Sequence, residues 1–272
     1  MTMRVAFQGE PGAFSEDAVI TFSPDAETIP YKSWGDVFEV VFRGSADFGV
    51  VPVENSQAGS INETYDLLLS YPLNIYREIN VKIAHCLVAL PEATIDDIKV
   101  VYSHPQAIAQ CQEFLNELKV EVIAGYNTAG SAKKVKEEGI KAHAAIASSR
   151  AAQIYGLEIL ASDIQTNPNN FTKFFVISKK QPERAEKNKT SLVFSTRNIP
   201  GALYKIMGVF ATRNINLTKL ESRPSKDKPW EYVFYVDFEG HVEDGICKDA
   251  LSEMNDKTNF MKILGSYPRA EN

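Results

Sequence analysis

Short apolar runs alternate with amphipathic stretches from the N-terminus to about residue 178. Apolar residues that recur every three to four positions indicate helices, and short runs of apolar, β-branched residues indicate strands. Such alternation is typical of α/β proteins. We expect strands at residues 4–8, 48–53, 100–103, 120–123, 144–147 and 173–178, an extended buried segment at residues 79–90, and helices at residues 33–43, 61–69, 105–118, 128–138 and 148–155.

A second region with a different order of elements follows a polar segment. Residues 179–189 are charged and polar, contain Pro182 and have no apolar period, which is typical of a linker. After it the pattern predicts a strand at 191–195, a helix at 202–212, strands at 215–223 and 231–238, a helix at 244–254 and a strand at 260–266. The order βαββαβ predicts a ferredoxin-like domain. We expect the strand at 231–238 to be half-buried, because one set of residues alternates with another along it: Tyr232, Phe234, Val236 and Phe238 with Glu231, Val233, Tyr235 and Asp237.

Composition and charge narrow the class of protein. The 272 residues are 44% hydrophobic and 24% charged, enough for one large or two modest globular domains. A net charge of −6 argues against a nucleic-acid partner. Apolar runs such as residues 84–90 are far shorter than the ~20 residues of a membrane span, and we expect neither an anchor nor a signal peptide. Cys86, Cys111 and Cys247 suggest neither a disulfide framework nor a zinc site, so we expect a cytoplasmic protein.

Small polar residues gather where predicted strands lead into helices. These segments are Gly9 to Ser15, Pro52 to Ser56, Ser103 to Gln106, Asn127 to Ala129 and Ala147 to Ser149. In open α/β sheets the carboxyl ends of the strands line the ligand crevice, and helix N-termini offer free N–H groups there. The pattern therefore predicts a small anionic ligand.

Other kinds of site are disfavoured. The four histidines are scattered without HExxH or clustered carboxylates, so no metal or other cofactor is expected. Gly9 and Gly12 lack the spacing of a nucleotide-binding loop. Taken singly, each segment also has a simpler interpretation: a tight turn at Gly9–Gly12, helix caps at Ser33, Thr128 and Ser148, and a loop residue at His104. Only their occurrence together favours a site.

The ordered motifs resemble those of one family. They are GEPGAFSEDA from Gly9, VPVENSQAGSINETYDLL from Val51, SHPQAIAQC from Ser103, NTAGSA from Asn127, AAIAS from Ala144 and NFTKFFVI from Asn170. Together they resemble prephenate dehydratase across the whole first region. GALYKIMGVF from Gly201 and ESRP from Glu221 extend the likeness through a phenylalanine-binding ACT domain.

The resemblance implies an α/β catalytic domain of two lobes at residues 1–180, built like type II periplasmic binding proteins, a linker at 181–189 and a ferredoxin-like ACT domain at 190–272. It implies loss of water and carbon dioxide from prephenate without a cofactor, giving phenylpyruvate for phenylalanine synthesis. It assigns the catalytic role to Thr172, Lys173 and Phe174, with Thr172 as proton donor. Together with the strand-end positions it suggests, as substrate-binding residues, Ser15, Asn55, Ser56, Ser103, Gln106, Thr128, Ser148 and Asn170.

The chain departs from the family pattern at two positions. The family's Thr-Arg-Phe is here Thr172-Lys173-Phe174. Lysine keeps the charge but loses the planar fork that grips a carboxylate through two hydrogen bonds, so we expect Lys173 to hold the substrate as a point charge. Ser131 stands where Thr-Ala-x-Ala usually has alanine, which we consider minor.

The resemblance also implies regulation by L-phenylalanine, expected as an inhibitor. The expected effector-binding residues are Asn198, Gly201, Ala202, Leu203, Glu221, Ser222 and Arg223. In such domains the ligand typically lies between subunits, so a homodimer or homotetramer is expected. The alternatives are a two-lobed solute-binding protein, disfavoured by the absent signal peptide, a purely regulatory amino-acid sensor, and arogenate dehydratase, which acts on the aminated substrate.

Overall fold

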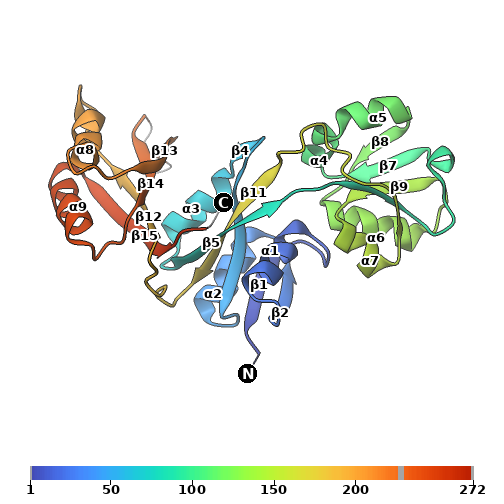
Figure 1. Ribbon diagram of the computed structural model, residues 1–272, viewed down its shortest axis with the longest axis horizontal. Coiled ribbons are helices and arrows are strands. Elements are labelled where there is room, and N and C mark those ends of the chain that lie inside the picture. Colours follow the sequence, from blue (N-terminus) through green and yellow to red (C-terminus); the bar gives the residue numbers. More distant parts are fainter. Residues whose placement is uncertain (1, 226–229, 271–272) are drawn as a thin grey trace. The chain divides into compact units, whose positions relative to one another are not determined.

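The computed structural model describes residues 2–225 and 230–270 (Figure 1). The chain divides into two compact units, one formed by Met1–Thr64 with Ile79–Phe174 and the other by Tyr65–Glu78 with Phe175–Asn272. Helix α3 (Asn62–Ser70) and strands β5 (Asn74–Lys82) and β11 (Phe171–Ser178) each continue from one unit into the other. The segment Tyr65–Glu78 therefore folds with the C-terminal residues, although it lies far from them in sequence.

The first sheet has the strand order β2-β1-β3-β11-β5, with β4 paired to β3. Its further elements are β1 (Arg4–Gln8), β2 (Glu27–Tyr31), β3 (Phe48–Asn55) and β4 (Gly59–Ser60), with helices α1 (Phe14–Phe22) and α2 (Trp34–Arg43). The predicted caps of α2 are confirmed: the side chain of Ser33 accepts a hydrogen bond from the N–H of Asp36, and Gly44 ends the helix at φ 79°. Strand β2 was not predicted, because this edge strand has no buried residue and shows no apolar pattern.

The second sheet has the order β10-β6-β9-β7-β8. Its strands are β6 (Cys86–Ala89), β7 (Val100–Ser103), β8 (Glu121–Ala124), β9 (His143–Ala147) and β10 (Glu158–Ala161), and its helices are α4 (Pro105–Gln110), α5 (Gln112–Leu118), α6 (Thr128–Glu138) and α7 (Ser149–Tyr155). Figure 1 shows α4 and α5 on one side of this sheet and α6 and α7 on the other. The mixed α/β fold predicted from the sequence is confirmed.

Two predicted elements are interrupted. The extended segment expected at residues 79–90 is broken at residues 83–85, because β5 and β6 belong to different sheets and the chain crosses between them here. The helix expected at residues 105–118 is broken at Cys111, whose φ of −110° and ψ of 20° lie outside the helical region. Each break places polar residues of the cavity described below.

The C-terminal elements follow the predicted order βαββαβ. They are β12 (Asn188–Ser195), α8 (Ala202–Ala211), β13 (Leu217–Pro224), β14 (Tyr232–Glu239), α9 (Gly245–Lys257) and β15 (Phe260–Pro268). The antiparallel sheet has the order β13-β14-β12-β15, which is the ferredoxin-like arrangement. Strand β12 begins at Asn188, so the last two residues of the expected linker lie in a strand.

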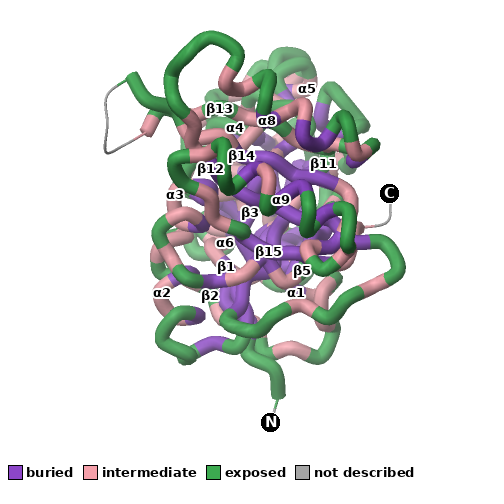
Figure 2. The backbone as a smooth tube through the Cα atoms, turned by 90° about the vertical axis from the view of Figure 1, so that its left-hand side faces the viewer, coloured by how far each residue is buried: buried purple, intermediate pink, exposed green. Residues whose placement is uncertain are grey.

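The prediction that the strand at residues 231–238 is half-buried is wrong for its second half. Residues 235–238 are all buried. On one face Val236 and Phe238 belong to the core with α8 and α9. On the other face the hydroxyl of Tyr235 donates to the carbonyl of Tyr65 at 3.0 Å, so the segment Tyr65–Glu78 covers this side. In Figure 2 the buried residues are concentrated in the strands, and the exposed residues in loops and helix surfaces.

Candidate functional site

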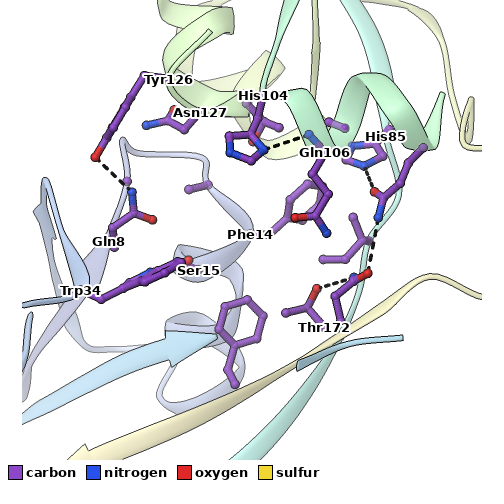
Figure 3. A pocket seen from close by; sticks show the side chains of 18 of the residues that line it. Gln8, Phe14, Ser15, Trp34, His85, His104, Gln106, Tyr126, Asn127 and Thr172 are labelled. Carbon is purple, nitrogen blue, oxygen red and sulfur yellow. Dashed lines mark hydrogen bonds between the residues drawn. The ribbon is translucent and has the colours of Figure 1, made fainter. Parts of the chain in front are cut away.

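A cavity of about 390 Å³ lies within the first unit (Figure 3). Both sheets contribute to it. Its lining comes from the end of β1 and the start of α1, from the start of α2, from Asn55, and from Thr172 and Phe174 of β11. The second sheet's side contributes His104, Gln106 and Ala107 at α4 and residues 126–128 at the start of α6. The polar strand ends that the sequence singled out are therefore largely brought together.

A hydrogen bond between Asn55 and Thr172 sets the direction of the threonine proton. The Oδ1 atom of Asn55 accepts from the backbone N–H groups of Gln57 and Ala58, both at 3.0 Å, which identifies the other amide atom as nitrogen. That nitrogen donates to Thr172 Oγ1 at 3.0 Å. Because the threonine oxygen accepts this bond, its own O–H is left to donate toward the cavity that Thr172 lines.

The amide network extends from Asn55 to a histidine. Asn55 Nδ2 also donates to Asn170 Oδ1 at 2.9 Å, and Asn170 Nδ2 donates to Gln110 Oε1 at 2.9 Å. The Oε1 atom of Gln110 lies 2.9 Å from His85 Nε2. Since that oxygen can only accept, His85 Nε2 carries a proton. The orientation of every amide in the network thus follows from two backbone N–H groups.

In the neutral form of His85 with the proton on Nε2, the ring's lone pair lies on Nδ1. This atom is buried and has no hydrogen-bond partner. Burial lowers the pKa of His85, and the hydrogen bond to Gln110 opposes this only in part. The ring lies edge-on to Phe14 with centroids 5.5 Å apart. His104, at the start of α4, also has a pKa lowered by burial, and its Nδ1 accepts from the N–H of Gln106 at 3.2 Å.

Six of the residues expected in the site line this cavity. They are Ser15, Asn55, Gln106, Thr128, Thr172 and Phe174. Asn170 lies behind the cavity wall and orients Asn55 and Gln110. Polar segments predicted from the sequence therefore line one cavity, and the roles of their individual residues stay predictions.

Lys173 is not among the cavity residues. Successive side chains of a strand point to opposite faces, so the two cavity residues Thr172 and Phe174 place Lys173 on the other face of β11. Its ammonium lies 4.0 Å from a carboxylate oxygen of Glu54. The expectation that Lys173 grips the substrate stays a prediction, and the structure pairs this residue with Glu54 and does not place it among the residues that line the cavity.

Three predicted serines make structural hydrogen bonds instead of lining the cavity. Ser103 Oγ donates to the carbonyl of Ile146 at 2.7 Å, and Ser56 Oγ to that of Asn169 at 3.1 Å. Ser148 Oγ donates to the carbonyl of Gly12 at 2.6 Å and caps α7. All three hydroxyls therefore donate to backbone carbonyls, and the expectation that they contact the substrate stays a prediction.

Several cavity residues were missed from the sequence. His85 lies in an apolar stretch, and the pattern around it predicts only a buried, extended segment. Gln110 is four residues after Gln106, and this spacing on one helix face was a usable signal. Trp34 was taken only as part of helix α2. Glu63 and Lys32 also line the cavity and carry its only side-chain charges among the described lining residues, apart from the histidines.

The two sheets are joined at the edge of the cavity by Tyr126. Its hydroxyl donates to the backbone carbonyl of Lys32, and Gln8 Nε2 lies 3.4 Å from the same hydroxyl. Figure 3 shows Tyr126 and Gln8 facing each other across this edge. The loop that ends at Asn127 is thereby held against the loop that leads into α2.

The expected effector residues lie in two segments of the second unit. Asn198, Gly201, Ala202 and Leu203 lie before and at the start of α8, and Glu221, Ser222 and Arg223 lie in β13. Gly201 is the residue before the helix and has a left-handed φ of 78°, which glycine adopts without strain. Arg223 Nη1 lies 3.2 Å from a carboxylate oxygen of Asp66 in α3.

Within residues 2–225 and 230–270, no group of three or more histidine, cysteine, aspartate or glutamate side chains is arranged to hold a metal ion. The same residues include no helix that combines the length and the apolar character needed to cross a membrane. The three cysteines are free and buried.

Comparison with known proteins finds relatives of the whole chain. The sequence matches the prephenate dehydratase family over residues 5–182 and the ACT domain family over residues 190–252. It is 42% identical over 277 residues to arogenate dehydratase/prephenate dehydratase 2, chloroplastic, of Arabidopsis thaliana, covering 98% of this chain and 73% of the relative.

Two solved structures are also similar over nearly the whole chain. A prephenate dehydratase from Arthrobacter aurescens in complex with L-Phe has a TM-score of 0.91 and 35% identity, covering 98% of this chain and 90% of that one. A structure described as GqqA, a novel type of quorum quenching acylase, has a TM-score of 0.91 and 34% identity, covering 98% of both chains.

Proposed function

Because the chain belongs to the prephenate dehydratase family, we propose that it converts prephenate to phenylpyruvate with loss of water and carbon dioxide. The observation that carries this proposal is the hydrogen bond from Asn55 to Thr172 Oγ1, which leaves the threonine O–H to donate into the cavity. A donor at that point is what the departure of the ring hydroxyl requires.

The reaction balances without an oxidant or a reductant. The bond between the ring and its carboxylate breaks to release carbon dioxide, and its electron pair enters the ring. The bond between the ring and its hydroxyl breaks as Thr172 donates a proton, so water leaves and the ring becomes aromatic. Thr172 then recovers a proton from water. A threonine hydroxyl is a weak acid, so it acts only because it is aligned and largely shielded from solvent, with a side chain that is 8% exposed.

The assignment of prephenate as the substrate can be tested directly. The purified protein is incubated with prephenate, and phenylpyruvate is followed by its ultraviolet absorbance in alkaline solution. Formation of phenylpyruvate at an enzymatic rate supports the proposal, and no formation above the uncatalysed rate contradicts it.

Arogenate is the alternative substrate, and one feature of the cavity supports it. Glu63 is the only carboxylate among the described residues that line the cavity, and it is suited to pair with the ammonium group that arogenate has and prephenate lacks. The relative from Arabidopsis thaliana is named for both activities. Comparing kcat/KM for the two substrates decides between them, and we expect the larger value for prephenate.

We further propose a division into a catalytic domain at residues 1–180, a linker at 181–189 and a regulatory domain at 190–272 that binds L-phenylalanine and inhibits the reaction. The match to ACT domains and the L-Phe bound to the related structure support this. The proposed effector residues are those at the start of α8 and in β13.

An assembly of two or four copies is proposed from the C-terminal sheet. Strand β13 is at the edge of this sheet, and Leu220 on it is 47% exposed. An exposed edge strand is suited to pair with another chain. The free, buried thiols support a reducing location such as the cytoplasm.

A further inference from the structure

Three buried side-chain atoms of the described chain lack a hydrogen-bond partner. They are Trp34 Nε1, His85 Nδ1 and Asn127 Nδ2. Most buried polar groups in proteins are hydrogen-bonded, so each exception needs an explanation. All three residues line the same cavity. Their clustering indicates that a ligand supplies the missing partners.

Two of these atoms, Trp34 Nε1 and Asn127 Nδ2, are hydrogen-bond donors. The indole nitrogen of Trp34 can only donate. The Oδ1 atom of Asn127 accepts from the N–H of Gly130 and caps α6, so its unpartnered atom is the NH₂ group. Both donors therefore require an acceptor, and an ammonium group cannot serve.

A lysine two residues before Trp34 also lines the cavity. Lys32 is the only lysine or arginine among the described lining residues, and its backbone carbonyl accepts from Tyr126, which precedes Asn127. This contact holds the loop before α6, which ends at Asn127, against the loop that leads into α2 and Trp34. In Figure 3 Asn127 and Trp34 lie to the left of Thr172, with Gln8 between them.

The chemistry of the substrate indicates which group belongs there. Prephenate carries its hydroxyl at one end of the ring and two carboxylates at the other: one on the ring, and one on the side chain. The ring carboxylate leaves as carbon dioxide, so strong donors to it would stabilise the ground state and slow the reaction. The side-chain carboxylate is unchanged and can be held tightly.

We propose that Trp34 Nε1 and Asn127 Nδ2, assisted by the charge of Lys32, form the subsite for the side-chain carboxylate of a 2-oxo acid. This proposal rests on the proposed function and adds residues to it. It places the carboxylate subsite on α2 and before α6, opposite the proton donor Thr172. Lys173, on the other face of β11, has no part in it.

Two substitutions remove the donors with little change in shape. Trp34→Phe keeps an aromatic ring, and Asn127→Asp keeps the oxygen that caps α6 while replacing the NH₂ group by a repelling oxygen. The matched controls are Trp230→Phe and Asn116→Asp, which change the same residue types at exposed positions outside the cavity. Melting temperatures show which variants are folded.

The readouts are KM and kcat for prephenate and the Kd of phenylpyruvate, which keeps the side-chain carboxylate but cannot react further. A lost hydrogen bond to a charged group predicts a rise of roughly ten- to hundredfold in KM and Kd, with kcat changed much less. The controls should match the wild type. Unchanged KM and Kd in both folded cavity variants would overturn the subsite while wild-type turnover supports the reaction. If the wild type forms no phenylpyruvate, the proposed function fails, and this subsite fails with it.

Discussion

Asn55 Nδ2 donates to Thr172 Oγ1 over 3.0 Å, although the two residues are 117 positions apart in the chain. The bond does more than hold Thr172 in place. Because Asn55 Oδ1 is already occupied by two backbone N–H groups, the amide cannot turn over and accept the threonine proton. The hydroxyl must therefore donate elsewhere, and the cavity is where the substrate would accept it.

Reversing this hydrogen bond tests its role. Asn55→Asp keeps the oxygen that binds Gln57 and Ala58 but replaces the donor by a second acceptor, which would take the proton of Thr172. We expect kcat for prephenate to fall by roughly 10²–10⁴-fold, the range for a lost proton donor, while the protein stays folded. Steady-state kinetics with a circular dichroism spectrum measure both. A kcat within a few-fold of wild type would show that Asn55 does not direct the proton.

The variant Lys173→Met distinguishes the placement of Lys173 in the structure from the substrate-binding role that the family motif implies. Since Lys173 pairs with Glu54 outside the cavity, we expect KM for prephenate to change by less than about threefold. The pair is partly exposed, so the free energy of unfolding should fall by no more than about 1 kcal/mol. KM is measured by initial rates and stability by urea unfolding. A KM raised tenfold or more would restore Lys173 to the substrate site.

The neutral state of His85 predicts a pH dependence of stability. Burial lowers the pKa of His85 in the folded protein. The unfolded chain then binds the proton more tightly, so this contribution to stability is complete above about pH 6.5 and is lost as the pH falls through the lowered value. In His85→Gln, which keeps an N–H donor for Gln110, the loss of unfolding free energy between about pH 7.5 and about pH 5.5 should be smaller.

The tautomer of His85 can be observed directly. Nitrogen-detected NMR of histidine-labelled protein should show one ring that is protonated at Nε2 and bare at Nδ1 near pH 7.5, and whose pKa lies below the ordinary value of about 6.5. A ring bare at Nε2 would contradict the network, and a ring that titrates near the ordinary value would contradict the expected pH dependence.

L-phenylalanine binding is predicted to depend on Gly201. Its φ of 78° disfavours any side chain, and a Cβ atom would lie at the start of α8 where the effector is expected. Calorimetric titration should detect binding to the wild type and to Gly208→Ala, a control inside the same helix, and at least tenfold weaker binding to Gly201→Ala. Absence of binding to the wild type would remove the sensor role and leave the catalytic one.

Truncation is a poor substitute for that experiment. The segment Tyr65–Glu78 folds with the C-terminal residues: Lys262 Nζ donates to the carbonyls of Leu68, Leu69 and Tyr71 at 2.8–2.9 Å. Deleting the residues after Lys189 removes these partners from helix α3. Lost activity in such a variant would therefore not report on phenylalanine.

The local sequence pattern was sufficient to predict features that depend on a single helix or strand. The caps Ser33 and Gly44 act within a few residues, so the bounds of α2 followed from them. The alternation of side chains along β11 also predicts that Lys173 faces away from Thr172. The family motif, by contrast, implied that both residues contact the substrate. The covered face of β14 could not be inferred, because the residues that cover it come from Tyr65–Glu78, far away in sequence.

The polar network was beyond sequence reasoning for a different reason. His85, Gln110 and Asn170 are distant in sequence and meet only because the starts of β6 and β11 lie beside the end of α4. Their hydrogen-bond directions depend on one another through shared atoms, which no local pattern records. Trp34 was hidden for a similar reason, since its unpartnered N–H is apparent only from its surroundings.

The most direct test of the account is the turnover of prephenate by Thr172→Ala. This substitution removes the hydroxyl that receives the hydrogen bond from Asn55 and leaves the rest of the cavity in place. We predict a kcat lower by roughly 10²–10⁴-fold, partly restored in Thr172→Ser, with the affinity for phenylpyruvate little changed. A folded Thr172→Ala protein that forms phenylpyruvate within a few-fold of the wild-type rate would contradict the assignment of Thr172 as the proton donor.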